Sequence, residues 1–275
     1  MKSINLKLVN NVETNIHIFD GLLNDCRSII PNYNHFIIIT DENIYIHYGQ
    51  LLVNQFQNAN YNLIVCPPGE QIKTLNYTEK IYSDLISFKC DRQSCIVAFG
   101  GGAIGDLSGF VASTFMRGID YINIPTTLLS MIDSSIGGKS GVNLTSGKNL
   151  IGSIYHPKQI IIDPKLLETL PDREYHSGMA EMIKYSLILS KELFDTLEKH
   201  LESILSDLSV SINDLIVNCI DIKINIVEQD VRDHGIRNIL NFGHTIGHAL
   251  EACLGNEHIR HGEAVAYGML YAAKL

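Results

Sequence analysis

Short apolar runs alternate with helix-length amphipathic stretches in the first half of the chain. Four of these runs are predicted to be buried strands: His35 to Thr40, Asn62 to Cys66, Ser94 to Phe99 and Tyr121 to Ile124. Continuous apolar runs separated by segments long enough for a helix are typical of a parallel sheet covered on both faces. The pattern therefore predicts an α/β nucleotide-binding domain.

From Pro164 onward the apolar positions recur at helical spacing, and no further strand is predicted. A helix over 171–189 carries Glu181 and Lys184 one turn apart among apolar residues. Burying a carboxylate without a partner costs several kcal/mol, so Glu181 is expected to pair or to ligate. The pattern thus divides the chain into a Rossmann-like α/β domain, residues 1–163, and an all-α domain, residues 164–275.

A second long helix is predicted after the capping-box signal Ser211-x-x-Asp214. Its apolar stripe runs from Ile212 to Val227 and includes Lys223, which places an ammonium on the core face. Either the Lys223 side chain extends its charge to solvent, or it serves a buried site. The two readings differ in whether the ammonium has a buried anionic partner.

Composition describes a globular chain: of 275 residues, 45% are hydrophobic and 19% are charged. No apolar run approaches the ~18 residues that cross a bilayer, and the start lacks a signal-peptide core, so a cytoplasmic protein is expected. The net charge of −9 argues against nucleic acid or an anionic membrane as the main partner. Six scattered cysteines without a CxxC pair are expected to be buried thiols.

A glycine-rich turn follows the predicted strand that ends at Phe99. Residues 100–106 read GGGAIGD and fit G-x-G-x-x-G between a strand and a helix, where backbone N–H groups can approach a pyrophosphate. The motif follows the third strand rather than the first, and no acidic residue ends the next strand. In place of that acidic residue, Asp41 and Asn43 can hold the adenosine hydroxyls or base edges of a dinucleotide. Alternatively, they cap a helix. The turn Pro68 to Lys73 also follows a strand end, and without further context it is interpreted as a plain turn with solvated charges.

The densest polar run of the chain covers Pro125 to Gly152, with Lys139 and Lys148 each following a glycine. Flexible backbone N–H groups beside a positive charge suit phosphate, so we favour a phosphate cradle over a plain loop.

Four histidines and several carboxylates crowd into residues 237–263, which are predicted to form one helix and its exit loop. His244 and His248 stand at i and i+4 and share a helix face, either by coincidence or as a metal or acid–base pair. Glycines before both imidazoles leave room for a metal or a substrate. A break at Gly255-Asn256 would let the chain fold back and offer a third imidazole, from His258 or His261. With charged residues on several buried helix faces, the helical half is expected to hold an active site.

The chain resembles the 3-dehydroquinate synthase family over almost its whole length. The motifs that carry the resemblance are PGEQIK, GGGAIGD, PTTLLSMIDSS, GKNLIG, LPDRE, GMAEMIKY, LNFGHTIGHALE and HGEAVA, in this order. The resemblance implies a zinc site, with Co²⁺ as a possible substitute, whose ligands are Glu181, His244 and His261. Bare spacing would instead have paired His244 with His248, which the family pattern leaves unligated.

The resemblance also implies which residues contact the other groups. The implied NAD contacts are Asp41, Asn43, Glu70, Lys73, Gly101, Gly102, Ala103, Ile104, Gly105, Asp106, Thr126, Thr127, Asp133, Lys139, Lys148 and the segment from Leu166 to Thr169. The implied substrate contacts are Lys139, Asn149, Lys184, Lys223, Arg237, Asn241 and His248. Arg117 is implied to reach the neighbouring pocket of a homodimer.

The implied substrate is 3-deoxy-D-arabino-heptulosonate 7-phosphate, a phosphorylated sugar acid. In the implied reaction NAD⁺ takes hydride from an alcohol, phosphate is eliminated, hydride returns, and an aldol step closes the 3-dehydroquinate ring. Alternatives are a related sugar-phosphate cyclase, a metal-dependent polyol dehydrogenase, or a chain that binds NAD or zinc without turnover. The last is considered because family members continue past HGE through more helices, whereas this chain stops at Leu275 in an apolar helical pattern and is expected to be incomplete.

Overall fold

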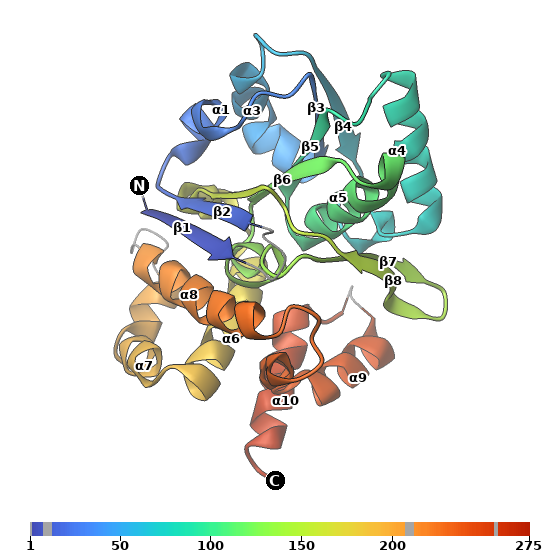
Figure 1. Ribbon diagram of the computed structural model, residues 1–275. Coiled ribbons are helices and arrows are strands. Elements are labelled where there is room, and N and C mark those ends of the chain that lie inside the picture. The colour runs from blue at the N-terminus through green and yellow to red at the C-terminus, as the bar shows by residue number, and fades with distance from the viewer. Residues whose placement is uncertain (1, 8–12, 207–211, 256–257) are drawn as a thin grey trace. The chain divides into compact units, whose positions relative to one another are not determined.

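The computed structural model describes residues 2–7, 13–206, 212–255 and 258–275 (Figure 1). The chain forms two compact units. The first, an α/β unit, comprises Met1–Thr126 and Ser134–Lys165; the second, a helical unit, comprises Thr127–Asp133 and Leu166–Leu275. The short segment Thr127–Asp133 therefore belongs with the helices, although the sequence pattern had placed it in the N-terminal domain. The predicted boundary between two domains after residue 163 remains a prediction.

The α/β unit is built on a seven-stranded sheet of order β1-β2-β9-β6-β5-β3-β4. All neighbouring pairs are parallel except β1 and β2. The strands of this sheet are β1 (Lys2–Lys7), β2 (Glu13–Ile18), β3 (His35–Asp41), β4 (Tyr61–Cys66), β5 (Ser94–Gly100), β6 (Asp120–Pro125) and β9 (Gln159–Ile162). The four strands predicted from apolar runs correspond to β3, β4, β5 and β6.

Helices cover both faces of this sheet, which is why its central strands β3, β5 and β6 are mostly apolar and buried at nearly every position. Ile37 of β3 belongs to one core with Ile81 and Leu107 from helices. The neighbouring Phe36 points to the opposite face, because side chains alternate along a strand, and stacks edge-on against Phe56 with ring centroids 5.0 Å apart. The helices of the unit are α1 (Cys26–Ile29), α2 (Glu42–Ile44), α3 (Gln50–Gln55), α4 (Leu75–Ser87) and α5 (Gly102–Thr114).

The polar run 125–152 is only partly loop. It contains a short helical turn, Ser130–Ser134, and most of a two-stranded antiparallel hairpin, β7 (Lys139–Leu144) and β8 (Gly147–Ile154). Glycines make the hairpin tight, since a Cβ on Gly152 would lie 2.3 Å from the carbonyl oxygen of Ser140. Sequence reasoning missed this hairpin because its strands are polar and lack clear alternation. It also missed β1, β2 and β9.

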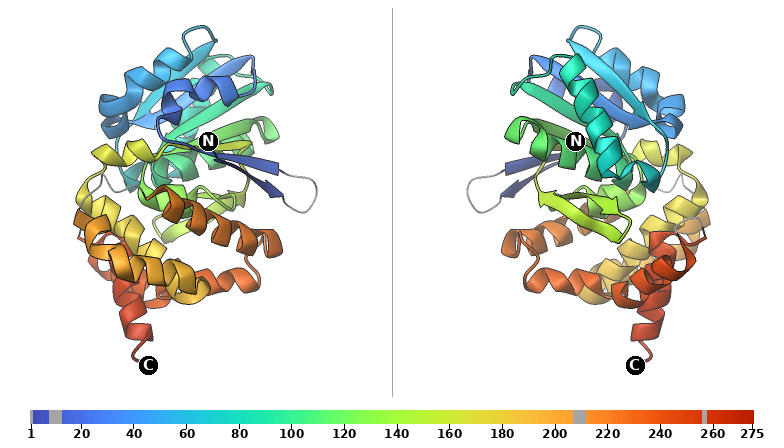
Figure 2. Two further views of the ribbon diagram at one scale, coloured as in Figure 1. Left: turned by 90° about the vertical axis from the view of Figure 1, so that its left-hand side faces the viewer. Right: turned by 90° about the vertical axis from the view of Figure 1, so that its right-hand side faces the viewer.

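The helical unit contains α6 (Asp172–Leu189), α7 (Lys191–Ser206), α8 (Asn213–Gln229), α9 (His244–Leu254) and α10 (His261–Ala272), coloured from yellow to red in Figure 1 and in the turned views of Figure 2. No strand is found in its described residues. The predicted capping residue Ser211 lies outside the described residues. None of the helices in the described part of the chain combines the length and the apolar character that crossing a bilayer requires.

Helix α10 packs closely against both α9 and α6. A Cβ on Gly268 would lie 1.9 Å from the carbonyl oxygen of Gly243, and one on Gly262 would lie 2.0 Å from that of Ser177. The expectation that Gly243 and Gly247 leave room for a ligand is therefore corrected: both glycines face the backbone of α10 at close range. They allow dense packing between helices, which brings the ends of these helices together.

Candidate functional site

Glu181 lies at the centre of the helical unit, on the buried face of α6, with none of its surface exposed. The ammonium of Lys184 is in ion-pair contact with Oε2. Neither carboxylate oxygen accepts a hydrogen bond of ordinary geometry from any described residue. Leaving a buried polar atom without such a bond is costly, and native proteins rarely do so without a reason. Because Lys184 engages Oε2, the geometry indicates that Oε1 is placed for a ligand.

Two imidazoles face this carboxylate. Nε2 of His244, at the start of α9, is 3.8 Å from Oε1 of Glu181, and Nε2 of His261, at the start of α10, is 3.6 Å from the same oxygen. In a tetrahedral zinc site with bonds of ~2.05 Å, ligand atoms lie about 3.3 Å apart. Two nitrogens and one oxygen therefore stand close to coordination spacing, and the residues fit a divalent metal with a position left open for substrate.

His248 lies beside these residues but is not among the three whose potential ligand atoms group around Glu181. Its ring centroid is 5.3 Å from that of His244 and 6.1 Å from that of His261. The spacing of His244 and His248 on α9 therefore places the two rings together, while the carboxylate of α6 selects His261 as the second imidazole. His248 instead groups with Glu251 and His261, whose potential ligand atoms lie within 4.8 Å of one another.

The helix expected across 237–254 is interrupted. Residues Ile236–Asn241 form a 3₁₀ turn, and α9 begins only at His244, after Gly243 in a left-handed conformation. The helix ends at Leu254 with Gly255 at φ 81°, as the glycine signal predicted. Arg237 and Asn241 therefore lie on a turn rather than on the face that carries the imidazoles.

A folded loop holds Arg237. Asp230 ends α8, and its carboxylate accepts hydrogen bonds from the backbone N–H groups of His234, Gly235 and Arg237 at 3.0, 2.7 and 3.2 Å. The same three bonds, led by that from His234, lower the pKa of Asp230. The Arg237 guanidinium is 3% exposed and donates through Nη1 to the carbonyl of Val231 at 3.1 Å. Sequence reasoning missed Asp230, although an aspartate at a helix end is a turn signal. The side chain of Asn241 is exposed and donates to that of Asn238.

Lys223 does not extend to solvent. Its ammonium is buried, donates to the backbone carbonyl of Asp133 at 2.6 Å and forms an ion pair with the Asp133 carboxylate. Burial opposes ionisation of Asp133, but the charges of Lys223 and Lys184 outweigh it and hold the pKa of this carboxyl well below its ordinary value. Asp133, implied as an NAD contact, thus has its carboxylate engaged within the helical unit. Its role toward NAD remains a prediction.

Tyr185 is a member of this network that sequence reasoning missed. Its ring is fully buried on α6, and its hydroxyl donates to Oδ1 of Asp133. The only sequence signal is its position directly after Lys184, on the same buried helix. Tyr185 thereby helps to fix the carboxylate that holds Lys223.

Replacing Tyr185 by phenylalanine is expected to destabilise the fold by about 1.5–3 kcal/mol, because a hydrogen bond to a buried charged group is lost. The matched control is Tyr175→Phe on the same helix, whose hydroxyl donates only a 3.4 Å bond to the carbonyl of Ile204. That control is expected to cost less than about 1 kcal/mol. Urea unfolding of the three proteins measures both values. Equal losses in the two variants would contradict a charged network at Tyr185.

A clamp joins the starts of α6 and α10. The Arg173 guanidinium donates to both oxygens of Glu263, at 2.7 and 2.8 Å, and to the carbonyl of His258 at 2.8 Å. Glu263 also accepts from the backbone N–H of Arg260. The Arg173 hydrogen bonds lower the pKa of Glu263 from 4.5 to about 2. The glutamate of the HGE motif is therefore a structural partner of α6, next to His261.

In the α/β unit, a third buried lysine, Lys73, joins three of the sequence motifs. Nζ of Lys73 is 2.7 Å from Oδ2 of Asp106, 2.9 Å from Oδ1 of Asn149 and 3.4 Å from Oε2 of Glu70. Burial lowers its pKa, but Asp106 and Glu70 outweigh burial and raise it above the ordinary value. Asn149 adopts φ 54°, and its N–H donates to Asn143. The network ties the PGEQIK turn and α5 to the hairpin.

The glycine-rich turn is placed as the motif predicted, between β5 and the N-terminus of α5. Gly101 caps this helix in an extended conformation, and the free N–H groups of its first turn are those that bind anions in such motifs. Gly102 lies close to Ser134, whose Oγ would be 3.2 Å from an added Cβ. Ala103, Ile104 and Gly105 follow within the helix.

The remaining predicted residues are placed as follows. Asp41 caps α2 by accepting from the N–H of Ile44 at 3.1 Å, the structural role foreseen as its alternative, and Asn43 is exposed. Thr126 is buried, and its backbone N–H donates a hydrogen bond to the carbonyl of Gly100. The hydroxyl of Thr127 donates a hydrogen bond to that of Ser130 within the helical unit. Leu166 is buried, whereas exposed positions are taken by Arg117, Lys139, Lys148 and Thr169.

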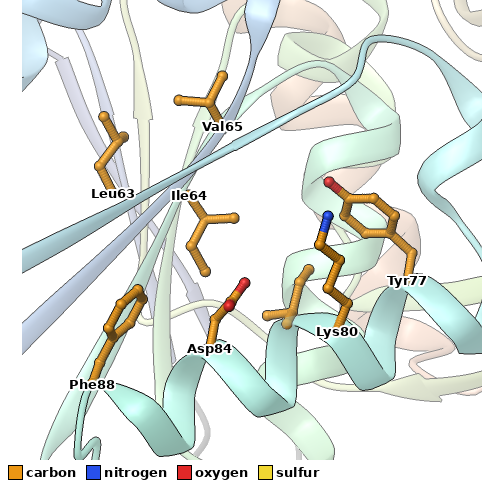
Figure 3. A pocket seen from close by; sticks show the side chains of 8 residues that line it. Leu63, Ile64, Val65, Tyr77, Lys80, Asp84 and Phe88 are labelled. Atoms are coloured by element: carbon orange, nitrogen blue, oxygen red, sulfur yellow. The ribbon is translucent and has the colours of Figure 1, made fainter.

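A cavity of about 260 Å³ lies elsewhere in the α/β unit, between the edge strand β4 and α4 (Figure 3). Ile64, Tyr77, Lys80 and Asp84 are among the residues that line it. It contains none of the predicted site residues and offers no cluster of catalytic groups.

Five of the six cysteines are buried and all six are free thiols, so the expectation of buried thiols is wrong only for Cys253.

Comparison with known proteins identifies relatives over the whole length of the chain. Residues 63–177 match the 3-dehydroquinate synthase N-terminal family and residues 178–275 the C-terminal family. The 3-dehydroquinate synthase of Crocosphaera subtropica is 46% identical over 243 residues, which are 87% of this chain and 67% of the relative. That of Clostridium botulinum is 45% identical over 265 residues, 94% of this chain and 75% of the relative.

Solved structures with the same fold include other cyclases. A 2-deoxy-scyllo-inosose synthase complexed with carbaglucose-6-phosphate, NAD⁺ and Co²⁺ superposes with a TM-score of 0.89 at 32% identity, covering 99% of this chain and 76% of the other. A 2-epi-5-epi-valiolone synthase from Streptomyces hygroscopicus with NAD⁺ and Zn²⁺ bound superposes with a TM-score of 0.85 at 28% identity. The match covers 96% of this chain and 74% of the other. Glycerol dehydrogenase from Schizosaccharomyces pombe shares the fold, with a TM-score of 0.68 at 20% identity over 94% of this chain and 70% of the other.

Proposed function

The chain belongs to the 3-dehydroquinate synthase family, and we propose that it converts 3-deoxy-D-arabino-heptulosonate 7-phosphate to 3-dehydroquinate and phosphate. The observation that carries the proposal is the buried Glu181 carboxylate, whose Oε1 accepts no hydrogen bond from the described residues and faces two imidazoles. Three buried cations, Lys184, Lys223 and Arg237, belong to the same unit. Two of them, Lys184 and Lys223, are paired with carboxylates in this structure, and all three are residue types that bind the carboxylate and phosphate groups of such a substrate.

Glu181, His244 and His261 would hold Zn²⁺ or Co²⁺. Burial lowers the pKa of His244 against the charge of Glu181, which favours the neutral imidazole that a metal needs. When bound, the metal and NAD supply a Lewis acid and a reversible hydride acceptor. The solved cyclases that contain NAD⁺ with Co²⁺ or Zn²⁺ support this assignment. The N-terminus of α5 would bind the NAD pyrophosphate, with Asp106 held in place by Lys73.

The remaining polar residues would bind and orient the substrate. Arg237 offers a planar fork of donors to a phosphate or a carboxylate, and its loop is held by Asp230. Lys223, fixed on Asp133, offers a point charge. His248 would exchange hydrogen bonds or a proton with the substrate beside the metal ligands. Lys139 and Asn149 of the hairpin would hold the phosphate during elimination, because a leaving group must be kept in line with the bond that breaks.

We further propose that the protein works as a homodimer in which Arg117 reaches the partner's substrate pocket. Met116 and Arg117 adopt φ 49° and 70°, a left-handed conformation that is costly for residues other than glycine. Arg117 is exposed on this turn. Strained backbone that presents a cation to the surface supports a binding role for this turn.

A second candidate is the activity of a related sugar-phosphate cyclase, since the 2-deoxy-scyllo-inosose synthase shares this fold at a TM-score of 0.89. The identity of 32% to that structure is lower than the 43% to 47% shared with curated 3-dehydroquinate synthases. This difference favours the dehydroquinate reaction. Polyol dehydrogenases share only the fold.

The test is phosphate release from 3-deoxy-D-arabino-heptulosonate 7-phosphate, with NAD and Zn²⁺ supplied. We expect release that requires both additions, stops with a chelator, and proceeds without net accumulation of NADH, because the hydride returns to the substrate. Glucose 6-phosphate in parallel tests the second candidate. Release from glucose 6-phosphate alone would overturn the substrate assignment, and NADH accumulation on glycerol without phosphate release would indicate a polyol dehydrogenase.

A further inference from the structure

The two imidazoles of the candidate metal site share one arrangement. Each turns Nε2 toward Oε1 of Glu181 and Nδ1 toward an oxygen acceptor. For His244 the acceptor is the backbone carbonyl of Phe242, at 3.2 Å. For His261 it is a carboxylate oxygen of Glu251, at 3.5 Å. A neutral imidazole has one N–H and one lone pair, so a proton on Nδ1 leaves Nε2 free to ligate.

Glu251 lies on α9, and its carboxylate contacts His261 at the start of α10. The residue is 8% exposed and stands one turn after His248, on the face of α9 that packs against α10. His261 is the first residue of α10 and is only partly held by its own helix. An ionised carboxylate is costly to bury and is retained where it has a charged or hydrogen-bonding partner. The Nδ1 atom of His261 provides such a partner.

We propose that Glu251 is a positioning residue for the metal centre: its carboxylate accepts the Nδ1 proton of His261 and so fixes the tautomer and ring orientation that present Nε2 beside Glu181. The inference rests on the proposed function, because it assigns His261 as a metal ligand. It gives His261 a side-chain partner in place of the backbone carbonyl that serves His244. Partners of this kind typically change metal affinity by about 10- to 100-fold.

A competing arrangement uses the same residues differently. His248, Glu251 and His261 lie close enough to hold a cation by themselves. A cation on Nδ1 of His261 would require the imidazole proton on Nε2, which would then face Glu181 as a donor rather than a ligand. The two arrangements therefore predict opposite tautomers for His261 and different residues on which metal binding depends.

Two measurements test the proposal. Zn²⁺ affinity, determined by chelator competition, is expected to fall about 10- to 100-fold in Glu251→Ala and less in Glu251→Gln, whose amide oxygen still accepts a hydrogen bond. Long-range ¹H–¹⁵N NMR of the metal-free protein, with His261→Asn for assignment, is expected to show the Nδ1–H tautomer in the wild type and its loss in Glu251→Ala. The matched control is Glu174→Ala, which removes the carboxylate paired with Arg260 at the start of the same helix and should leave the His261 tautomer unchanged.

The outcomes are distinguishable. An unchanged affinity and tautomer in Glu251→Ala would overturn the proposal. Zinc binding that survives Glu181→Gln but is lost in both His248→Ala and Glu251→Ala would assign the cation to the competing cluster and overturn it as well. If the wild type binds no zinc, the metal assignment of the proposed function fails, while the tautomer of the metal-free protein still decides whether Glu251 orients His261.

Discussion

Replacing Glu181 by glutamine is expected to abolish metal binding and to lower turnover by about 10³-fold. The amide has the shape of the carboxylate but not its charge, and a site of two neutral imidazoles alone binds zinc weakly. A Lewis acid contributes several kcal/mol to the stabilisation of developing negative charge, and ~4 kcal/mol corresponds to a factor of about 10³ in rate. Zinc stoichiometry after dialysis and phosphate release measure the two effects. A variant that retains stoichiometric zinc would contradict Glu181 as a ligand.

The same substitution also leaves the ammonium of Lys184 buried without its carboxylate. Breaking a buried pair in this way costs about 3–5 kcal/mol, whereas replacing both partners by apolar groups is often neutral. Glu181→Leu combined with Lys184→Met is therefore expected to recover most of the thermal stability lost in Glu181→Gln, but no zinc binding. A stable double variant without zinc separates loss of the ligand from loss of the fold. Recovery of zinc binding in the double variant would show that the ligands lie elsewhere.

Replacing Gly262 by alanine is expected to separate α10 from α6 and so to disrupt the metal site. The added Cβ would lie 2.0 Å from the carbonyl oxygen of Ser177 and 2.7 Å from its Cα, and backbone atoms cannot rotate aside. Helix α10 must move, and His261, the adjacent residue, moves with it. Overpacking costs about 1–3 kcal/mol, and a displacement of ~1 Å at a site can lower the rate about 10²-fold. Zinc affinity should fall together with the melting temperature.

Two variants control this experiment. Ser177→Ala removes the hydroxyl that accepts the N–H of Gly262 at 3.0 Å but creates no clash, so it should cost no more than about 1.5 kcal/mol. Leu270→Ala trims a side chain on the same helix that is 63% exposed and should change stability by less than about 0.5 kcal/mol. Wild-type zinc affinity in Gly262→Ala would contradict the role of this close contact in placing His261.

Much of the architecture follows from local pattern. Parallel strands that are covered on both faces are mostly apolar, so β3, β4, β5 and β6 were visible as short apolar runs, and helices such as α6 were visible from apolar periodicity. The hairpin β7–β8 was not visible, because polar strands that rely on glycine contacts carry neither signal. The 3₁₀ turn before α9 was read as helix, since its residues have no strong helix-breaking signal before Gly243.

Some residues of the candidate site could likewise be predicted from the sequence, and others could not. Spacing alone marked His244 and His248 as neighbours, and buried charge marked Glu181 and Lys223, because an apolar helix face does not carry charge without a reason. The family motifs supplied His261 as the second imidazole. Residues that act by holding others, such as Tyr185, Asp230 and Glu251, gave at most a weak local signal, such as the turn signal of Asp230, and none that named their partners. Their partners lie on other elements or across a folded loop, so their role appears only as distances.

By itself the sequence determined the four central strands, several of the long helices, the family and the residue types available for chemistry, because periodicity, turn glycines and ordered motifs are properties of neighbouring residues. Only the tertiary structure decided which of these residues meet. Glu181 faces His261 because Gly262 lets α10 approach α6 to backbone contact, and Lys223 is fixed by Asp133 because Thr127–Asp133 packs with the helices. Such contacts depend on the packing of elements distant in the chain, and that packing is not encoded in the spacing of any single motif.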